Sequence, residues 1–158
     1  MLDVRPLEYG DRAWLERVLR EETAGPMIVS RGHLHDGLEL PGLVASHEGE
    51  RAGALLHRVG GDELEIVFIA TTVRGVGAGA ALLAAAVELA ARERCRRAWL
   101  VTTNDNINAI GFYQRHGWDL VAFHRDAVAE SRRLKPAIPA TGNDGIPVRH
   151  ELEFEHLL

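Results

Sequence analysis

Residues 65–79 constrain the fold of this chain more than any other stretch. An apolar run over residues 64–70 predicts a buried strand, and a short polar turn, a loop with Gly75, Gly77 and Gly79, and an Ala/Leu-rich helix follow it. Glycines let a backbone approach an anion closely, and the start of a helix presents free N–H groups and the positive end of its dipole. Arg74 adds a forked positive charge. The stretch therefore predicts a phosphate-binding loop between a strand and a helix.

Length and composition limit the class of protein. The chain has 158 residues, 46% of them hydrophobic and 26% charged, so we expect one globular domain over residues 1–158. A formal net charge of -5 argues against a nucleic-acid partner. The single cysteine excludes an internal disulfide and favours a reducing compartment. With neither an apolar leader nor an apolar run long enough to span a bilayer, we expect a cytoplasmic protein without a membrane partner.

The pattern along the chain predicts an α/β protein with a mixed sheet. Residues 21–42 lack clear periodicity and are expected to form a long loop or short helical turns, and Asp11 is expected to cap the first helix. The strand–helix–strand unit over residues 64–103 favours a parallel pair of strands. Expected strands cover residues 4–7, 43–46, 52–59, 64–70, 98–103, 120–124 and 151–157, and expected helices cover 11–20, 78–94 and 106–116.

The glycine loop by itself fits more than one kind of site. A plain strand-to-helix turn needs only one or two glycines. A dinucleotide-binding fingerprint is formally matched by Gly75-x-Gly77-x-x-Ala80. That fingerprint follows its strand almost at once, whereas residues 70–74 intervene here. The acidic residue expected about 20 positions on is also late, at Asp105. The spacing therefore disfavours a dinucleotide.

A second motif lies on the predicted helix that starts near Asn106. Asn106, Ala109 and Tyr113 are three and four residues apart, so they share one helix face. Alanine leaves room beside this face for a ligand, while the amide and the phenol offer polar contacts. Alternatively, Phe112 and Tyr113 are ordinary core aromatics of an amphipathic helix.

The two motifs together resemble the GNAT acyltransferase superfamily. Arg74-x-x-Gly77-x-Gly79 is similar to its R-x-x-G-x-G signature, and the run from Asn106 is similar to N-x-x-A-x-x-x-Y-x-x-x-G-F, with Trp118 in place of Phe. The resemblance implies a mixed, mostly antiparallel central sheet with a splayed parallel pair, flanked by helices. It implies acetyl-CoA as the acyl donor. The implied cofactor-binding residues are Val67, Phe68 and Ile69 for the pantetheine, Arg74, Gly75, Val76, Gly77, Ala78, Gly79 and Ala80 for the pyrophosphate, and Asn106, Ala109 and Tyr113 on the helix.

The resemblance also implies an activity: transfer of an acetyl group to a primary amine of a small molecule or peptide by direct attack. Tyr113 is the implied acid for the departing thiolate, and the Ile69 amide serves the oxyanion. We predict Glu65 as the base, because it precedes Ile69 by four in one strand and both side chains would share a face. A solvent-facing Glu65 is the alternative. Two of the eight histidines, His33 and His35, are two apart without a third ligand, so no metal is expected.

The C-terminal part is rich in proline and basic residues. The run Lys135-Pro136-Ala137-Ile138-Pro139 resembles the ending of a bacterial GNAT subgroup of unassigned substrate. Proline-fixed loops cost less entropy to order, so residues 125–148 are expected to form an ordered loop, lid or interface, with a helical turn near 127–134 and a homodimer as one option. A CoA-binding sensor without turnover and an acyltransferase that uses a longer acyl chain are open alternatives.

Overall fold

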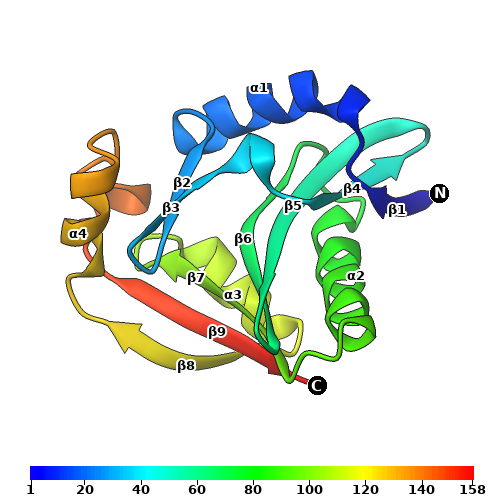
Figure 1. Cartoon of the computed structure of the whole chain (residues 1–158). Coiled ribbons are helices and arrows are strands. Elements are labelled where there is room, and N and C mark those ends of the chain that lie inside the picture. Colours follow the sequence, from blue (N-terminus) through cyan, green and yellow to red (C-terminus); the bar gives the residue numbers. More distant parts are fainter.

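The computed structural model describes all 158 residues and is built around a seven-stranded sheet (Figure 1). The strand order is β1-β4-β5-β6-β7-β9-β8, and β6 and β7 are its parallel neighbours, all other neighbours being antiparallel. This confirms the expected mixed, mostly antiparallel sheet. The strands are β1 (Leu2–Pro6), β4 (Gly42–His47), β5 (Glu50–Gly60), β6 (Glu63–Thr71), β7 (Arg97–Thr103), β8 (Asp119–His124) and β9 (Glu151–Leu157).

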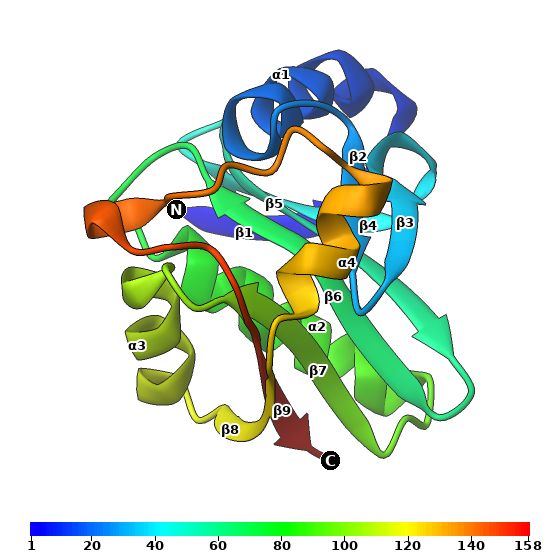
Figure 2. The same cartoon turned by 90° about the vertical axis from the view of Figure 1, so that its left-hand side faces the viewer.

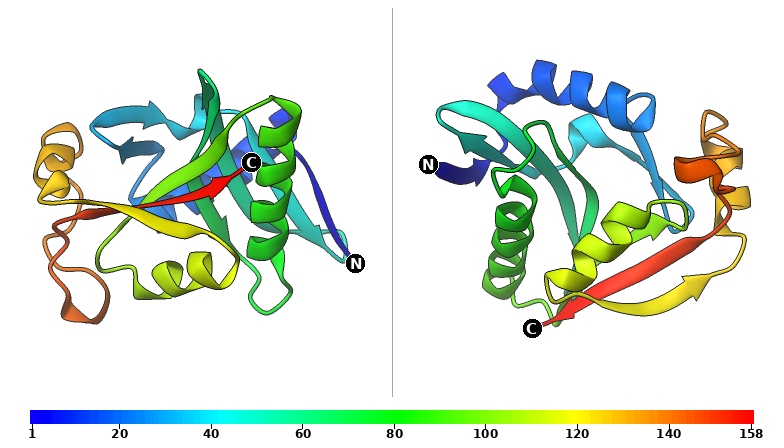
Figure 3. Two further views of the ribbon diagram at one scale, coloured as in Figure 1. Left: turned by 90° about the horizontal axis from the view of Figure 1, so that it is seen from below. Right: turned by 180° about the vertical axis from the view of Figure 1, so that it is seen from behind.

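Helices cover both faces of the sheet. On one face, α1 (Arg12–Thr23) buries Leu15, Val18 and Leu19 against β5 and β6. On the opposite face lie α2 (Ala78–Arg92), with an apolar stripe against the sheet, and α3 (Ile107–Arg115) (Figure 3). α4 (Ala127–Leu134) lies apart from these layers, beside the hairpin of β2 (Met27–Ser30) and β3 (His33–Asp36) (Figure 2). The sheet thus separates two apolar cores.

The sheet opens between β6 and β7. Their parallel pairing starts at Glu63 with Arg97 and ends at Glu65 with Trp99. From Ile66 onward this edge of β6 has no strand partner, so the expected splayed pair is confirmed. The gap places unpaired backbone N–H and C=O groups inside the protein, where they need polar partners.

A β-bulge in β6 overturns one expectation about Glu65. Leu56 pairs with Phe68 and His57 pairs with Ile66, so Val67 is an extra residue in β6. An extra residue reverses the alternation of side chains beyond it. Ile69 accordingly packs on the core under α2, whereas Glu65 lies on the face of α1. The expectation that Glu65 and Ile69 share a face is therefore wrong.

Residues 21–42 are more regular than expected. They contain a hairpin of β2 (Met27–Ser30) and β3 (His33–Asp36), followed by a 3-10 turn at Gly37–Glu39. Each strand has four residues, which is too short for a clear alternating pattern. Ile28 joins the core beneath α1, so tertiary packing stabilises this hairpin.

Asp11 does not cap α1 with its side chain. It adopts a helical backbone conformation, while a capping residue needs an extended one. Its buried carboxylate instead accepts hydrogen bonds from Arg5 at 2.7 Å, from Arg51 at 2.8 Å and from the Glu8 amide at 2.8 Å. The hydrogen bond from Arg5 holds the pKa of Asp11 well below its usual range. Asp11 therefore ties β1 to β5.

Residues 125–148 are ordered by their own contacts. The Arg132 guanidinium donates to the carbonyls of Ile138, Pro139 and Val148 at 3.3, 2.7 and 2.8 Å. The buried Asp105 carboxylate accepts from the Asn143 amide at 3.1 Å.

In none of the helices do length and hydropathy suffice for crossing a membrane.

Candidate active site

The loop before α2 is shaped to hold an anion. Gly75 and Gly77 have φ angles of +78° and +82°, which L side chains rarely adopt. A Cβ on Gly79 would lie 3.1 Å from the Phe112 ring. No side chain caps the first amides of α2, so they are free to bind an anion. Arg74 is exposed beside them and makes no ion pair in the structure.

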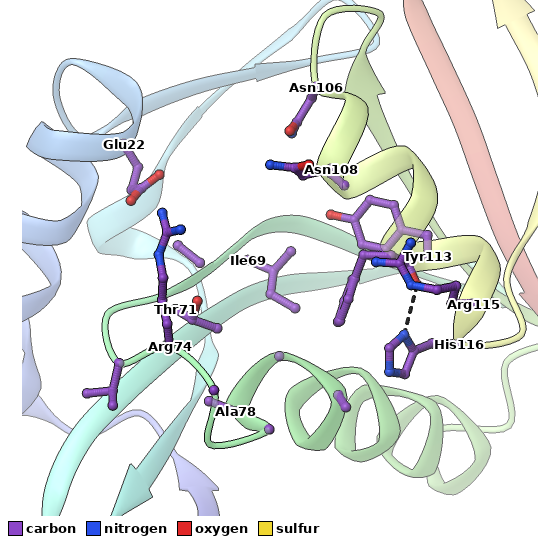
Figure 4. Close-up of a pocket in the computed structure, with 18 residues that line it drawn as sticks. Glu22, Ile69, Thr71, Arg74, Ala78, Asn106, Asn108, Tyr113, Arg115 and His116 are labelled. Atoms are coloured by element: carbon purple, nitrogen blue, oxygen red, sulfur yellow. Dashed lines mark hydrogen bonds between the residues drawn. The ribbon is translucent and has the colours of Figure 1, made fainter. Parts of the chain in front are cut away.

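This loop opens into a cavity of about 570 Å³ between the end of β6 and α3 (Figure 4). Both predicted motifs contribute to its wall, although they lie far apart in the sequence. The predicted cofactor residues that line it are Ile69, Arg74, Gly75, Gly77, Ala78, Gly79, Ala80, Asn106, Ala109 and Tyr113. Val76 instead packs on the core under α2. The cavity is large enough for an extended ligand that starts at the amides and ends at α3.

Tyr113 lies at the inner end of this cavity. Its ring packs against Phe154, with centroids 5.5 Å apart, and against Phe112 at 5.8 Å. Burial raises the pKa of Tyr113 to about 12. About two turns earlier, at the N-cap of α3, the Asn106 side chain donates to the Thr102 hydroxyl at 3.0 Å. Tyr113 is thus both a core aromatic and a wall of the cavity, so the two alternatives for it do not exclude each other.

A second cavity of about 250 Å³ occupies the gap between β6 and β7. Val67 and Phe68 line it from β6, Val101 and Thr102 from β7, and Val29 from β2. The residues that line both cavities are Glu22, Ile69, Asn106 and Tyr113. The two cavities therefore meet along these four residues, and we call this place the junction.

Glu65 lines neither cavity. Its side chain is buried, 3% exposed, and accepts hydrogen bonds from the Ser30 hydroxyl at 2.6 Å and from Arg58 at 3.3 Å. The structure thus places Glu65 between β2 and the sheet. Its predicted role as a base stays a prediction, which this placement does not favour.

Two acidic residues that line the second cavity were not predicted. Glu22, in the last turn of α1, is the one acid that lines both cavities, and it makes no ion pair. In Figure 4 its carboxylate points toward the Arg74 guanidinium, on the side of the view opposite Tyr113. Glu151, at the start of β9, lines the second cavity and pairs with Arg31 at 2.9 Å. A signal for Glu22 exists in the sequence, because two acids at the C-terminal end of a helix oppose its dipole.

No group of three or more His, Cys, Asp or Glu residues is placed to hold a metal ion. His33 and His35 line neither cavity.

A mixed sheet that opens at its parallel pair, with an amide cradle leading to a buried tyrosine, defines a class of acyltransferases. The model of the acetyltransferase (GNAT) family matches residues 8–118. The chain belongs to this family.

Similar proteins support the assignment. The uncharacterized protein YdhI of Bacillus subtilis (strain 168) is 40% identical over 121 residues, which are 76% of each chain. A Bacillus subtilis acetyltransferase solved in complex with CoA has a TM-score of 0.71 at 19% identity and covers 100% of this chain and 99% of its own. A GNAT family acetyltransferase from Elizabethkingia anophelis with acetyl-CoA bound has a TM-score of 0.71 at 15% identity, covering 99% and 98%. At these identities the two structures support the fold.

Proposed function

We propose that this protein is an N-acetyltransferase that transfers the acetyl group of acetyl-CoA to a primary amine by direct attack. The observation that carries the proposal is the junction: the cavity from the amide cradle and the second cavity share Tyr113, Glu22, Ile69 and Asn106 in their walls. The cavity from the amide cradle suits an extended donor with phosphate at its outer end, and the acyl end of this donor would enter the second cavity, where the acceptor would meet it. The proposal treats residues 1–158 as one catalytic domain.

The residues present fit acetyl-CoA. The free amides at Gly77–Gly79 and the unpaired Arg74 would hold the pyrophosphate, because helix N-termini and guanidinium groups both favour phosphate. Val67, Phe68 and Ile69 lie at the unpaired edge of β6, where backbone groups are available to the amides of a pantetheine arm. Acetyl-CoA supplies an activated thioester when bound.

Groups of the chain itself would then accept the amine proton and stabilise the developing negative charge. As the amine attacks the acyl carbon, a C–N bond forms, the C–S bond breaks, and one amine proton must leave. We propose Glu22 as the proton acceptor, because it is the one carboxylate that lines both cavities. The Ile69 amide is the proposed donor to the developing oxyanion.

Tyr113 is the proposed donor to the departing sulfur. Its pKa of about 12 keeps the phenol protonated at every physiological pH. A thiol has a pKa of about 8.5 in water, so full proton transfer from this phenol is uphill by roughly 3 to 4 pKa units. Burial raises the pKa of a leaving thiol as well, which reduces the difference between the pKa values of the phenol and the thiol. The geometry and the pKa therefore support a hydrogen bond to the sulfur as the main contribution of Tyr113.

Finer aspects of the proposal rest on the sequence. These are membership of the bacterial subgroup with the Lys135–Pro139 run, a cytoplasmic location, a small-molecule or peptide amine as acceptor, and a homodimer. Light scattering on the purified chain tests for the homodimer.

The proposal is tested with Tyr113→Phe. We expect kcat to fall about 100-fold, with the KM for acetyl-CoA changed less than twofold, because only the transition-state contact is lost. Thiol release with a panel of amines measures both. Tight CoA binding without turnover for any amine would instead identify a CoA-binding module. Faster turnover with longer acyl-CoA donors would identify a different acyltransferase.

A further inference from the structure

Lys135 is the only lysine of the chain, and the other 17 of its 18 Lys and Arg residues are arginines. Its ammonium is partly buried and donates to the carbonyls of Thr23 and Met27, the second at 2.6 Å. An ammonium is a compact point charge with three donors that can reach separate acceptors, whereas the planar fork of arginine matches a carboxylate. Lysine therefore suits this position, where one cation serves two carbonyls.

The two carbonyls belong to the ends of one connection. Thr23 is the last residue of α1 and Met27 is the first of β2, so residues 24–26 link the helix to the hairpin. Carbonyls in the last turn of a helix have no partner within the helix, and a cation there also interacts favourably with the negative end of the helix dipole. Lys135 thus joins the end of α1 to the start of β2.

The C-terminal segment holds Lys135 in turn. Pro136 disfavours a helical backbone at the residue before it, so α4 ends there and Lys135 has a φ of -138° and a ψ of 87°. Arg132, on α4, donates to the carbonyls of Pro139 and Val148 at 2.7 and 2.8 Å, which fixes the helix on the following loop. Figure 2 shows α4 beside the hairpin. The ammonium is therefore presented to α1 from an ordered element.

The end of α1 that Lys135 holds carries Glu22, the proposed proton acceptor. Glu22 directly precedes Thr23 and lines both cavities, and Thr23 lines the second. Together with Glu21, it places two negative charges at the negative end of the helix dipole, which by itself favours fraying of this turn. A cation on the Thr23 carbonyl offsets that charge. The position of the Glu22 carboxylate therefore depends on Lys135.

We propose that Lys135 is a positioning residue for the acetyl transfer: through the carbonyls of Thr23 and Met27 it holds the end of α1, and with it the Glu22 carboxylate, at the junction. This inference rests on the proposed function and on Glu22 as the proton acceptor. Lys135 lines neither cavity, so its effect on the reaction passes through Glu22.

Hydrogen exchange tests the contact itself. Lys135→Met removes the ammonium, so the end of α1 opens more often and we expect the amides of residues 20–28 to exchange at least about fivefold faster. Arg133→Met is the matched control. It removes an exposed cation of α4 that pairs with Glu130 on the same helix, and is expected to leave this exchange unchanged. Unchanged exchange in Lys135→Met, measured by mass spectrometry, would overturn the inference.

The kinetic test uses spermidine, 2-phenylethylamine and an Ala-initiated tetrapeptide as acceptors with the purified full-length protein. For the amine that reacts fastest, we expect Lys135→Met to lower kcat/KM about tenfold, while the Kd of acetyl-CoA, measured by calorimetry, stays within about threefold. Arg133→Met is expected to change neither quantity. Lys135→Gln, which keeps a donor group and is expected to lose less, serves if the Met variant does not fold.

A double-mutant cycle with Glu22→Gln separates positioning from a general loss of structure. If Lys135 acts through Glu22, Lys135→Met lowers kcat/KM by less than about twofold once residue 22 is glutamine. A further tenfold loss in that background would overturn the inference and leave the proposed function standing. No acetylated product from any of the three amines with the wild-type protein would overturn the proposed function itself.

Discussion

At the scale of single residues, Glu22, Glu65 and Glu151 differ in what surrounds them. Glu22 is exposed to both cavities and has no cationic partner. Glu65 is buried and interacts with Ser30 and Arg58. Glu151 is also buried and pairs with Arg31. A carboxylate that receives a proton needs access to the amine. A carboxylate that ties two elements together needs its partners.

Isosteric glutamines separate these roles. We expect Glu22→Gln to lower kcat/KM for the amine by about 10- to 100-fold with little change in Tm, because an exposed carboxylate adds little stability. We expect Glu65→Gln to lower the free energy of unfolding by about 1–3 kcal/mol, because a buried charge-assisted pair is weakened, with a smaller effect on kcat. Steady-state kinetics and urea unfolding measure the two effects. Loss of kcat in Glu65→Gln at unchanged Tm would restore Glu65 as the base.

At the scale of elements, the connection from β6 to α2 positions the donor site. Its left-handed glycines turn the chain so that α2 begins at the cavity with free amides. The β-bulge at Val67 changes which side chains of β6 face the second cavity. β6 therefore contributes to both cavities, whereas the loop that follows it lines only the first.

Gly77 offers a matched comparison with Gly49, a turn residue between β4 and β5. Their φ angles are +82° and +81°, and no heavy atom lies closer than 4.0 Å to a Cβ built on either. We expect each Gly→Ala variant to lose about 1 kcal/mol of stability from backbone strain. Only Gly77→Ala is expected to raise the KM for acetyl-CoA, by about tenfold, because the amide cradle shifts. Equal KM values in the two variants would contradict the assigned loop.

At the scale of the whole molecule, the contacts of highest sequence separation hold the layers together. Arg31 with Glu151 and Lys135 with Met27 join the hairpin of β2 and β3 to the C-terminal elements. Asp11 joins β1 and β5 through Arg5 and Arg51.

The network around Asp11 predicts acid sensitivity. Because the pKa of Asp11 is lowered from its ordinary value of 3.8, its ionised form stabilises the fold above about pH 4, and this contribution is lost as the pH falls further. We expect Asp11→Asn to be about 1–3 kcal/mol less stable than the wild type at pH 7. The difference should shrink at pH 2.5 in urea unfolding. A difference independent of pH would rule out this source of stability.

The sequence alone predicted the features that depend on local backbone and spacing. The glycine loop, the shared face of Asn106, Ala109 and Tyr113, and the parallel pair all follow from neighbouring residues, and the structure has each of them. The hairpin at residues 27–36 escaped prediction because its short strands are stabilised by packing. The wrong face for Glu65 came from one extra residue in β6, which is defined only by pairing with β5.

The amino-acid sequence therefore determined the glycine loop with free helix amides and the helix face that lines the first cavity, because these depend on φ angles, helix ends and a 3.6-residue period. The tertiary structure decided which acids reach the junction and how large the second cavity is. Glu22, Arg31 and Glu151 come from distant parts of the chain, and their positions depend on how the hairpin, α1 and β9 pack together.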